Sequence, residues 1–226
     1  MKKALSFAAF LAAELLVAQI VPAQGTIYLS NLGETPVGSG AIGTDSWLAQ
    51  YFTTGTNSTG YILNSVQLLM NAASGNPTGF GAAIYSSPGN GAPGINLGSL
   101  TGSDPAAGGL FTFASPGLTL LPSTFYFVVV TASSSTAQGA YSWSAADSMG
   151  RSFVAPGDPW TIPDAFYSSA NGSTWTFNAR QNVFQLAIDA NANPVPEPGD
   201  SALFVLGALS LLWSYRNAKP IRTARG

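Results

Sequence analysis

The side chains best suited to binding chemistry lie around Trp160. This tryptophan closes the segment 156–160, which contains two prolines and a glycine and is typical of a loop. An exposed indole can stack on the apolar face of a sugar ring, and Asp158 and Asp164 could accept hydrogen bonds from sugar hydroxyls. These three residues are our candidates for a glycan contact. The alternative, which is the commoner fate of a tryptophan, is that Trp160 packs in the core. Core packing is expected still more strongly for the other tryptophans of this region, Trp47, Trp143 and Trp175.

Carboxylates are the main candidates for metal or acid–base chemistry. The sequence contains no Cys and no His, which excludes disulfides, thiol and imidazole catalysis, and Cys/His zinc sites. Asp147, Asp158 and Asp164 could supply oxygen ligands to Ca²⁺, but their spacing does not match an EF-hand loop. No spacing brings two carboxylates together as glycoside hydrolysis requires. We therefore expect no metal, no cofactor and no enzyme, with a secreted Asp/Glu-dependent glycan hydrolase as the alternative.

The composition narrows the class of protein further. Only 8% of the 226 residues are charged, against roughly 25% in an ordinary soluble protein, and the formal net charge is −2. A nucleic-acid-binding protein needs a basic surface, so nucleic acid is not an expected partner. Hydrophobic residues make up 46% of the chain and aromatic residues 12%, which is enough to fill a core. We therefore expect one folded domain rather than a disordered chain.

The N-terminus has the pattern of a secretory signal. Two lysines precede an apolar stretch over residues 4–21, and Ala23 follows as a small residue at a cleavage position. We expect a signal helix over residues 1–23, removed by signal peptidase after Ala23. Because Glu14 interrupts the apolar stretch, a retained N-terminal anchor is the alternative.

The C-terminus has the pattern of a membrane span. Residues 201–215 carry no charge, and as a helix they would extend about 22 Å, short of a bilayer core of about 30 Å. A basic tail follows at 216–226, and the positive-inside rule keeps it in the cytoplasm. We expect a single transmembrane helix over 201–215, with the body on the outside; a buried core helix is the alternative. The basic residues expected to stop transfer are Arg216, Lys219, Arg222 and Arg225.

A proline-rich linker, residues 193–200, separates the body from this span. Its prolines fix φ and remove N–H donors, so we expect an extended and accessible strip. Together with the span and the basic tail, this strip resembles the sorting signal of the PEP-CTERM family of exported bacterial proteins. The resemblance implies processing at or near the strip by an exosortase, an integral-membrane cysteine protease or transpeptidase. The motif residues are Val195, Pro196, Glu197 and Pro198.

The body, residues 24–192, consists of short apolar runs separated by Gly, Pro, Asn and Ser, without a long helical period. The apolar run Phe125–Val130 predicts a central core strand, and the alternation over 183–188 predicts a half-buried strand. The pattern predicts a mainly β chain, an antiparallel β-sandwich of jelly-roll type. The expected strands are Thr26–Leu29, Trp47–Thr53, Tyr61–Met70, Gly79–Tyr85, Leu110–Phe113, Phe125–Thr131, Ala140–Trp143, Thr174–Phe177 and Val183–Ile188.

The order of these segments also resembles the choice-of-anchor R domain, a β-sandwich of exported bacterial proteins with varied C-terminal anchors. The resemblance covers roughly residues 42–190 and is carried by Tyr61–Leu68, Gly81–Ser86, Leu120–Val128 and Trp143. No catalytic residue is attached to that family, so the resemblance implies no enzyme.

We therefore expect an exported bacterial protein that passes through the inner membrane to the cell surface or the extracellular matrix. Its expected role is structural or adhesive, with exopolysaccharide contact, after sorting by an exosortase. A permanently anchored, uncleaved surface protein is a further alternative, which differs only in the fate of residues 199–226.

Overall fold

The computed structural model describes residues 25–89, 91–147, 160–179, 182–194 and 210. Contacts within the chain separate a unit of residues Met1–Asn193 from a second unit, Pro194–Gly226. The predicted signal segment, the sorting motif, the apolar span apart from Ser210, and the basic tail lie outside the described residues. They stay predictions. No helix in the described part is long and apolar enough to cross a membrane.

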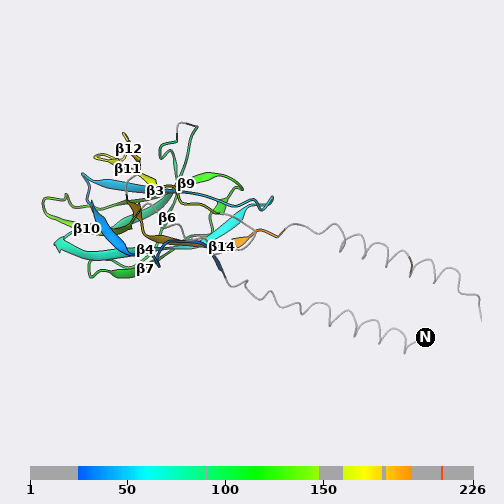
Figure 1. The fold of residues 1–226 in the computed structure, drawn as a ribbon, viewed down its shortest axis with the longest axis horizontal. Helices are drawn as coiled ribbons and strands as arrows, with labels where there is room; N and C mark the ends of the chain where they lie inside the picture. The colour runs from blue at the N-terminus through cyan, green and yellow to red at the C-terminus, as the bar shows by residue number, and fades with distance from the viewer. Residues whose placement is uncertain (1–24, 90, 148–159, 180–181, 195–209, 211–226) are drawn as a thin grey trace, which may run out of the picture. The chain divides into compact units, whose positions relative to one another are not determined.

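The described body is built from two antiparallel sheets that form two layers (Figure 1). The larger sheet has the strand order β1-β14-β4-β10-β13, with β2 paired to β10 and both β7 and β8 paired to β4. Its longest strand, β4, lies between β14 and β10. The strands of this sheet are β1 (Thr26–Ser30), β2 (Pro36–Ile42), β4 (Tyr61–Gly75), β7 (Gly109–Ala114), β8 (Thr119–Leu120), β10 (Gly139–Ala146), β13 (Val183–Phe184) and β14 (Leu186–Ala192).

The second sheet has six strands in the order β12-β11-β3-β9-β5-β6. The apolar strand β9 lies inside it, between β3 and β5, as the run Phe125–Val130 predicted. The strands are β3 (Trp47–Thr53), β5 (Gly81–Ser86), β6 (Asn96–Leu100), β9 (Phe125–Thr131), β11 (Ala165–Ser169) and β12 (Thr176–Ala179).

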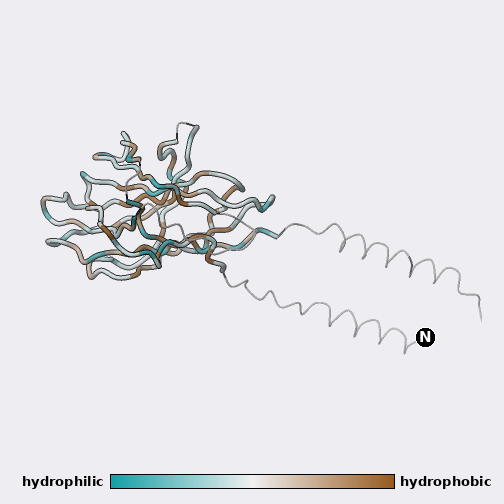
Figure 2. Tube along the Cα trace, in the orientation of Figure 1, coloured by the Kyte–Doolittle hydropathy of each residue, from teal (hydrophilic) through white to brown (hydrophobic). Residues whose placement is uncertain are grey.

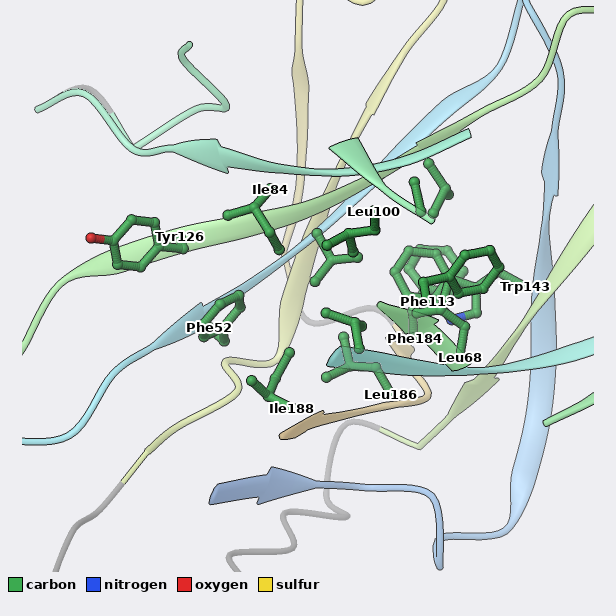
Figure 3. Close-up of a cluster of buried hydrophobic side chains, with 14 of the residues drawn as sticks. Phe52, Leu68, Ile84, Leu100, Phe113, Tyr126, Trp143, Phe184, Leu186 and Ile188 are labelled. Carbon is green, nitrogen blue, oxygen red and sulfur yellow. The ribbon is translucent and has the colours of Figure 1, made fainter. Parts of the chain in front are cut away.

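The main core lies between the two sheets, as in a β-sandwich. Because side chains alternate along a strand, alternate residues of the central strands of both sheets enter this core, and apolar segments recur along the strands of both layers (Figure 2). Trp143 and Phe184 stack at 4.7 Å between ring centroids, near Phe113, while Phe52 and Tyr126 lie toward the other end (Figure 3). The mainly β class and the two antiparallel sheets are thus confirmed.

The segment predicted as one half-buried strand over 183–188 is two strands. The chain pairs with β10 up to Phe184 and with β4 from Leu186 onward, so it changes partner at Gln185. The prediction of one half-buried strand was wrong, since Gln185 is 0% exposed and Ala187 is 1% exposed. Both faces of this segment are covered.

Gln185 is tolerated in the interior because its side chain is fully hydrogen-bonded. Its Oε1 accepts a hydrogen bond of 2.8 Å from the Ser144 hydroxyl. Its Nε2 donates to the carbonyl oxygens of Glu34 at 2.9 Å and Asn31 at 3.3 Å. A buried amide with these partners avoids the cost of unsatisfied polar groups and ties the 31–34 turn to β10.

Four strands, β2, β6, β8 and β11, were not predicted from the sequence. Strand β2 contains a proline and two glycines, which usually count against a strand. Gly40 is needed there because a Cβ atom would lie 2.5 Å from Leu48 Cδ1 and 2.7 Å from Phe184 Cζ. Gly40 is therefore explained by close packing against Leu48 and Phe184, which are distant in the sequence.

Candidate functional site

Trp160 does not offer its ring to solvent. Its side chain is 0% exposed and stacks on Phe52, with 5.8 Å between ring centroids and an interplanar angle of 4°. Tyr28 stacks on it at 5.2 Å, and Tyr61 meets it edge-on at 4.9 Å. The prediction that Trp160 contacts glycan was therefore wrong, and core packing is confirmed, because burial leaves no face for a sugar ring.

The aspartates considered as glycan or Ca²⁺ ligands are not gathered around Trp160 in the described residues. Asp164 is half-buried just before β11, Asp147 is exposed after β10, and Asp158 lies outside the described residues. Within the described ranges, no group of three acidic side chains is placed to hold a metal ion. Of the three residues predicted to contact glycan, Trp160 is buried and Asp158 lies outside the described residues. Asp164 alone is described and partly exposed.

Several other carboxylates serve as structural hydrogen-bond acceptors. Asp45 accepts from the Thr136 amide at 2.8 Å, which holds the pKa of this carboxyl below its usual value. Asp104 accepts from the Tyr141 hydroxyl at 2.8 Å, and Asp189 accepts from the Asn64 amide group at 3.1 Å. These contacts join each carboxylate to a neutral partner on another part of the sandwich rather than to a second acid.

A second apolar cluster lies on the outer side of the six-stranded sheet. Val128 and Val130 of β9 point into the main core, while Phe127 and Val129 point the other way. Together with Ala49 of β3, they form a buried base on which partly exposed rings pack. We call this surface the outer aromatic face; it comprises Trp47, Tyr51, Tyr85, Phe125, Phe127, Tyr167, Trp175 and Phe177.

The rings of this face contact one another across four strands. Tyr51 lies 6.4 Å from Phe125 and 6.1 Å from Tyr167, and Tyr167 lies 5.1 Å from Phe177, between ring centroids. Phe125 is 50% exposed and Phe177 is 52% exposed, so rings at both ends of this chain of contacts meet solvent. Burial raises the pKa values of Tyr51 and Tyr167 above their usual value near 10, so both phenols are protonated hydrogen-bond donors at neutral pH and stay so into alkaline solution.

Trp47 is held in a fixed position at one side of this face. Its indole N–H donates a hydrogen bond of 3.0 Å to the Thr44 carbonyl. Gly172, in the turn between β11 and β12, lies against its six-membered ring: a Cβ atom there would be 2.8 Å from Cζ3. The turn is closed by Asn171, whose Oδ1 accepts from the amide of Thr174 at 3.0 Å. Trp47 therefore forms a rigid wall.

Beside Trp47 the outer aromatic face is hollowed. The hollow has a volume of about 170 Å³ and reaches from β3 across β9 and β5 to β6. The hollow exists because β5 has small residues, Gly81 and Ala83, where larger side chains would fill the space between Trp47 and Tyr85. Its lining is Trp47, Gly81, Ala82, Ala83, Tyr85, Asn96, Ser99, Val129 and Thr131.

No formal charge enters this hollow, because its lining contains no Asp, Glu, Lys, Arg or His. None of the described residues is a lysine, an arginine or a histidine, while six of them are Asp or Glu. The described part of the body is therefore acidic, and the hollow offers only apolar surface, hydroxyls and an amide.

The outer side of the larger sheet is different in character. There Asn64 donates to Asp189 at 3.1 Å and accepts from Asn191 at 3.3 Å, which forms a polar network across β4 and β14. An antiparallel sheet with one solvated face normally carries such polar residues outside. The six-stranded sheet carries aromatic rings there instead, and this asymmetry singles out its outer face.

No family model, curated protein or solved structure matches the chain. What the face can do therefore follows from its own side chains. Among its described residues it combines aromatic faces, small residues and neutral hydrogen-bonding groups, and these include neither the paired carboxylates of hydrolysis nor the cations that bind anions.

Sequence reasoning looked for an exposed ring at Trp160, which is buried, and missed the aromatic surface of the six-stranded sheet. A usable signal was present in β3, where Trp47 and Tyr51 alternate with Leu48 and Phe52. Such a strand is apolar on both sides, and only one side of a sheet in a two-layered sandwich faces the core. The second side had to be either covered or exposed as a surface of large rings.

Proposed function

We propose that the protein is an exported bacterial surface or matrix protein whose sandwich makes adhesive, non-catalytic contact with polysaccharide through the outer aromatic face. The observation that carries this proposal is that face, with rings in contact across four strands and exposed at both ends. A contiguous group of exposed large apolar side chains often marks a binding site. Flat rings interspersed with hydroxyl groups suit sugars, which present apolar ring faces edged by hydroxyls.

The two ends of the chain supply the route to the surface in this proposal. The signal over residues 1–23 exports the body, and the span over 201–215 holds it at the inner membrane. An exosortase then acts at or near Pro196, Glu197 and Pro198. The resemblances to the PEP-CTERM signal and to the choice-of-anchor R domain, and the jelly-roll type of the sandwich, belong to the same proposal.

The described body supports a linker that leaves the sandwich at a defined point. The Asn193 amide donates to the Gly60 carbonyl at 2.9 Å, and its carbonyl accepts from the Thr59 hydroxyl at 2.6 Å. Asn57 donates to the same carbonyl at 3.1 Å. These bonds hold the chain up to Asn193, and the proposed processing motif begins in the sequence two residues later, at Val195.

The proposal is tested by the intact mass and the attachment of the native protein. Membrane and matrix fractions of the host are analysed separately by mass spectrometry. We expect a matrix form that lacks residues 1–23 and ends near Pro198, and that is released from the matrix by polysaccharide-degrading enzymes. A membrane form retaining Gly226 as the sole species would support the uncleaved anchor and overturn exosortase sorting.

A hydrolase is the second class of function to be separated from this one. Incubation of the purified protein with matrix polysaccharide measures the release of reducing ends. The adhesive proposal expects none above a heat-denatured control. Sustained release that is lost when Asp164 is replaced by asparagine would overturn it.

A further inference from the structure

We propose that the hollow beside Trp47 is a subsite for one uncharged pyranose residue of a neutral polysaccharide, and that the body discriminates against acidic polysaccharides. This inference rests on the proposed function and adds the chemical class of the ligand and the residues that select it.

The size of the hollow fits a single ring rather than a buried oligosaccharide. Its volume of about 170 Å³ lies below the roughly 300–1,000 Å³ of pockets that enclose drug-sized ligands. Its lining includes two residues without a bulky side chain, Gly81 and Ala83, between the rings of Trp47 and Tyr85. A sugar ring bound there would lie beside Trp47, and its neighbours in the polymer would continue along the outer aromatic face.

Trp47 is suited to recognition because its position is set before a ligand arrives. The hydrogen bond to Thr44 and the packing of Gly172 restrain the indole on one side, and the hollow opens beside it. A ligand therefore does not have to order this side chain, which avoids an entropic cost of binding.

The polar groups at the rim match hydroxyls. Asn96 and Ser99 of β6 are exposed, and their side chains make no hydrogen bond to any described residue. An amide and a hydroxyl can each donate and accept hydrogen bonds, so each can bind a sugar hydroxyl that acts as acceptor or as donor. Thr131 on β9 adds a second hydroxyl to the lining.

Charge decides between neutral and acidic sugars. A carboxylate or sulfate on the polymer would need a cation, and residues 24–192 contain only two, Arg151 and Arg180, both outside the described residues and neither in the lining of the hollow. Burial is the main cause of the raised pKa of Tyr51, and the negative charge of Asp164 adds to the rise, which places this carboxylate near the face. The seven acidic residues of segment 24–192 outnumber its two arginines, so the net negative charge of the body disfavours an anionic polymer.

The test uses the protein purified from its host and the host's extracellular polysaccharide, separated by anion exchange into neutral and acidic fractions. Affinity electrophoresis measures binding of each fraction to the wild type, W47A, S99W and L110A. Ser99→Trp fills the hollow without removing Trp47, and Leu110, 53% exposed on the larger sheet, is the matched apolar control. Melting temperatures show that each variant is folded.

We expect the neutral fraction to bind and the acidic fraction to be excluded. Trp47→Ala and Ser99→Trp should each weaken binding about tenfold or more, as loss of a central aromatic contact does, and Leu110→Ala should not change it. Binding of the acidic fraction alone, or neutral binding that both hollow variants leave unchanged, overturns the inference while the proposed function stands. Binding of neither fraction overturns polysaccharide contact itself.

Discussion

Gly172 lies against the six-membered ring of Trp47, with backbone φ of +70° in the turn between β11 and β12. A residue with a side chain would be strained at this φ and would collide with the ring, so glycine serves two purposes at one position. The turn thereby fixes an aromatic wall on the neighbouring strand, and the outer aromatic face depends on a residue that has no side chain.

This relationship gives a first prediction. Gly172→Ala should lower the free energy of unfolding by about 1–2 kcal/mol and should also weaken polysaccharide binding, because Trp47 has to move. Gly33→Ala is the matched control, since a Cβ atom at Gly33 meets nothing within 4 Å. Chemical denaturation and binding are measured on both variants. A Gly172→Ala protein with wild-type values in both assays would show that the contact is not constraining.

The burial of Trp160 predicts a stability effect without a surface role. Trp160→Ala removes a ring packed between Phe52, Tyr28 and Tyr61, and should cost about 3–5 kcal/mol of unfolding free energy. Trp175→Ala, on the partly exposed outer face, should cost far less and should reduce binding instead. Thermal melts of the two variants separate the roles. An unchanged melting temperature for Trp160→Ala would contradict the core assignment.

The burial of Tyr141 and its contact with Asp104 predict that this tyrosine ionises at an unusually high pH. Burial raises the pKa of Tyr141 to about 12, and the 2.8 Å hydrogen bond to Asp104 adds to the rise. Since the folded-state pKa lies above the unfolded value near 10, this group stabilises the fold fully below pH 10 and loses that contribution as the pH rises toward 12. Ultraviolet titration should show a phenolate that forms near pH 12 in the wild type and is missing in Tyr141→Phe. An equal number of late-titrating phenols in both proteins would refute the assignment.

The buried side chain of Gln185 predicts a large cost for removal of its amide. Gln185→Ala leaves the Ser144 hydroxyl and the Glu34 and Asn31 carbonyls without this partner, at about 1–3 kcal/mol for each group that water cannot reach. Gln67→Ala, on the outer side of β4, should change stability by less than about 0.5 kcal/mol. Denaturant titration compares the two. Equal stability of both variants would mean that water replaces the amide in the core.

Much of the sandwich could be predicted from local pattern. The bounds of β3 and β9 agree with the predicted runs, because β9 is continuous in large apolar residues up to Val130 and β3 is rich in them, with Ala49 and Gln50 between its aromatic ends. The strands that were missed are short, rich in glycine and serine, or two residues long, and they are set by partners distant in sequence. Pairing of Gly40 with Trp143 is an example, since tertiary packing overrides a weak local preference there.

The position of the candidate site could not be predicted from the sequence. The sequence offered Trp160 as a candidate for glycan contact, with core packing as the commoner alternative, and the structure shows the core packing. Which ring is buried depends on how the sheets stack: Trp160 meets Tyr28 and Phe52 from strands of different sheets. The hollow needs Trp47 and Asn96, which lie on β3 and β6 with β9 and β5 between them. No spacing along the sequence reveals that these two residues line the same hollow.

Oxidative footprinting by mass spectrometry, with and without the host's neutral polysaccharide, tests most directly whether the outer aromatic face makes the contact. We expect bound polysaccharide to protect the rings of Trp47, Tyr51, Trp175 and Phe177, and to leave Leu110 and Leu69 on the opposite outer face unchanged. Protection of the larger sheet's outer face, or oxidation of all four rings at the unbound rate under saturating polysaccharide, would contradict the account.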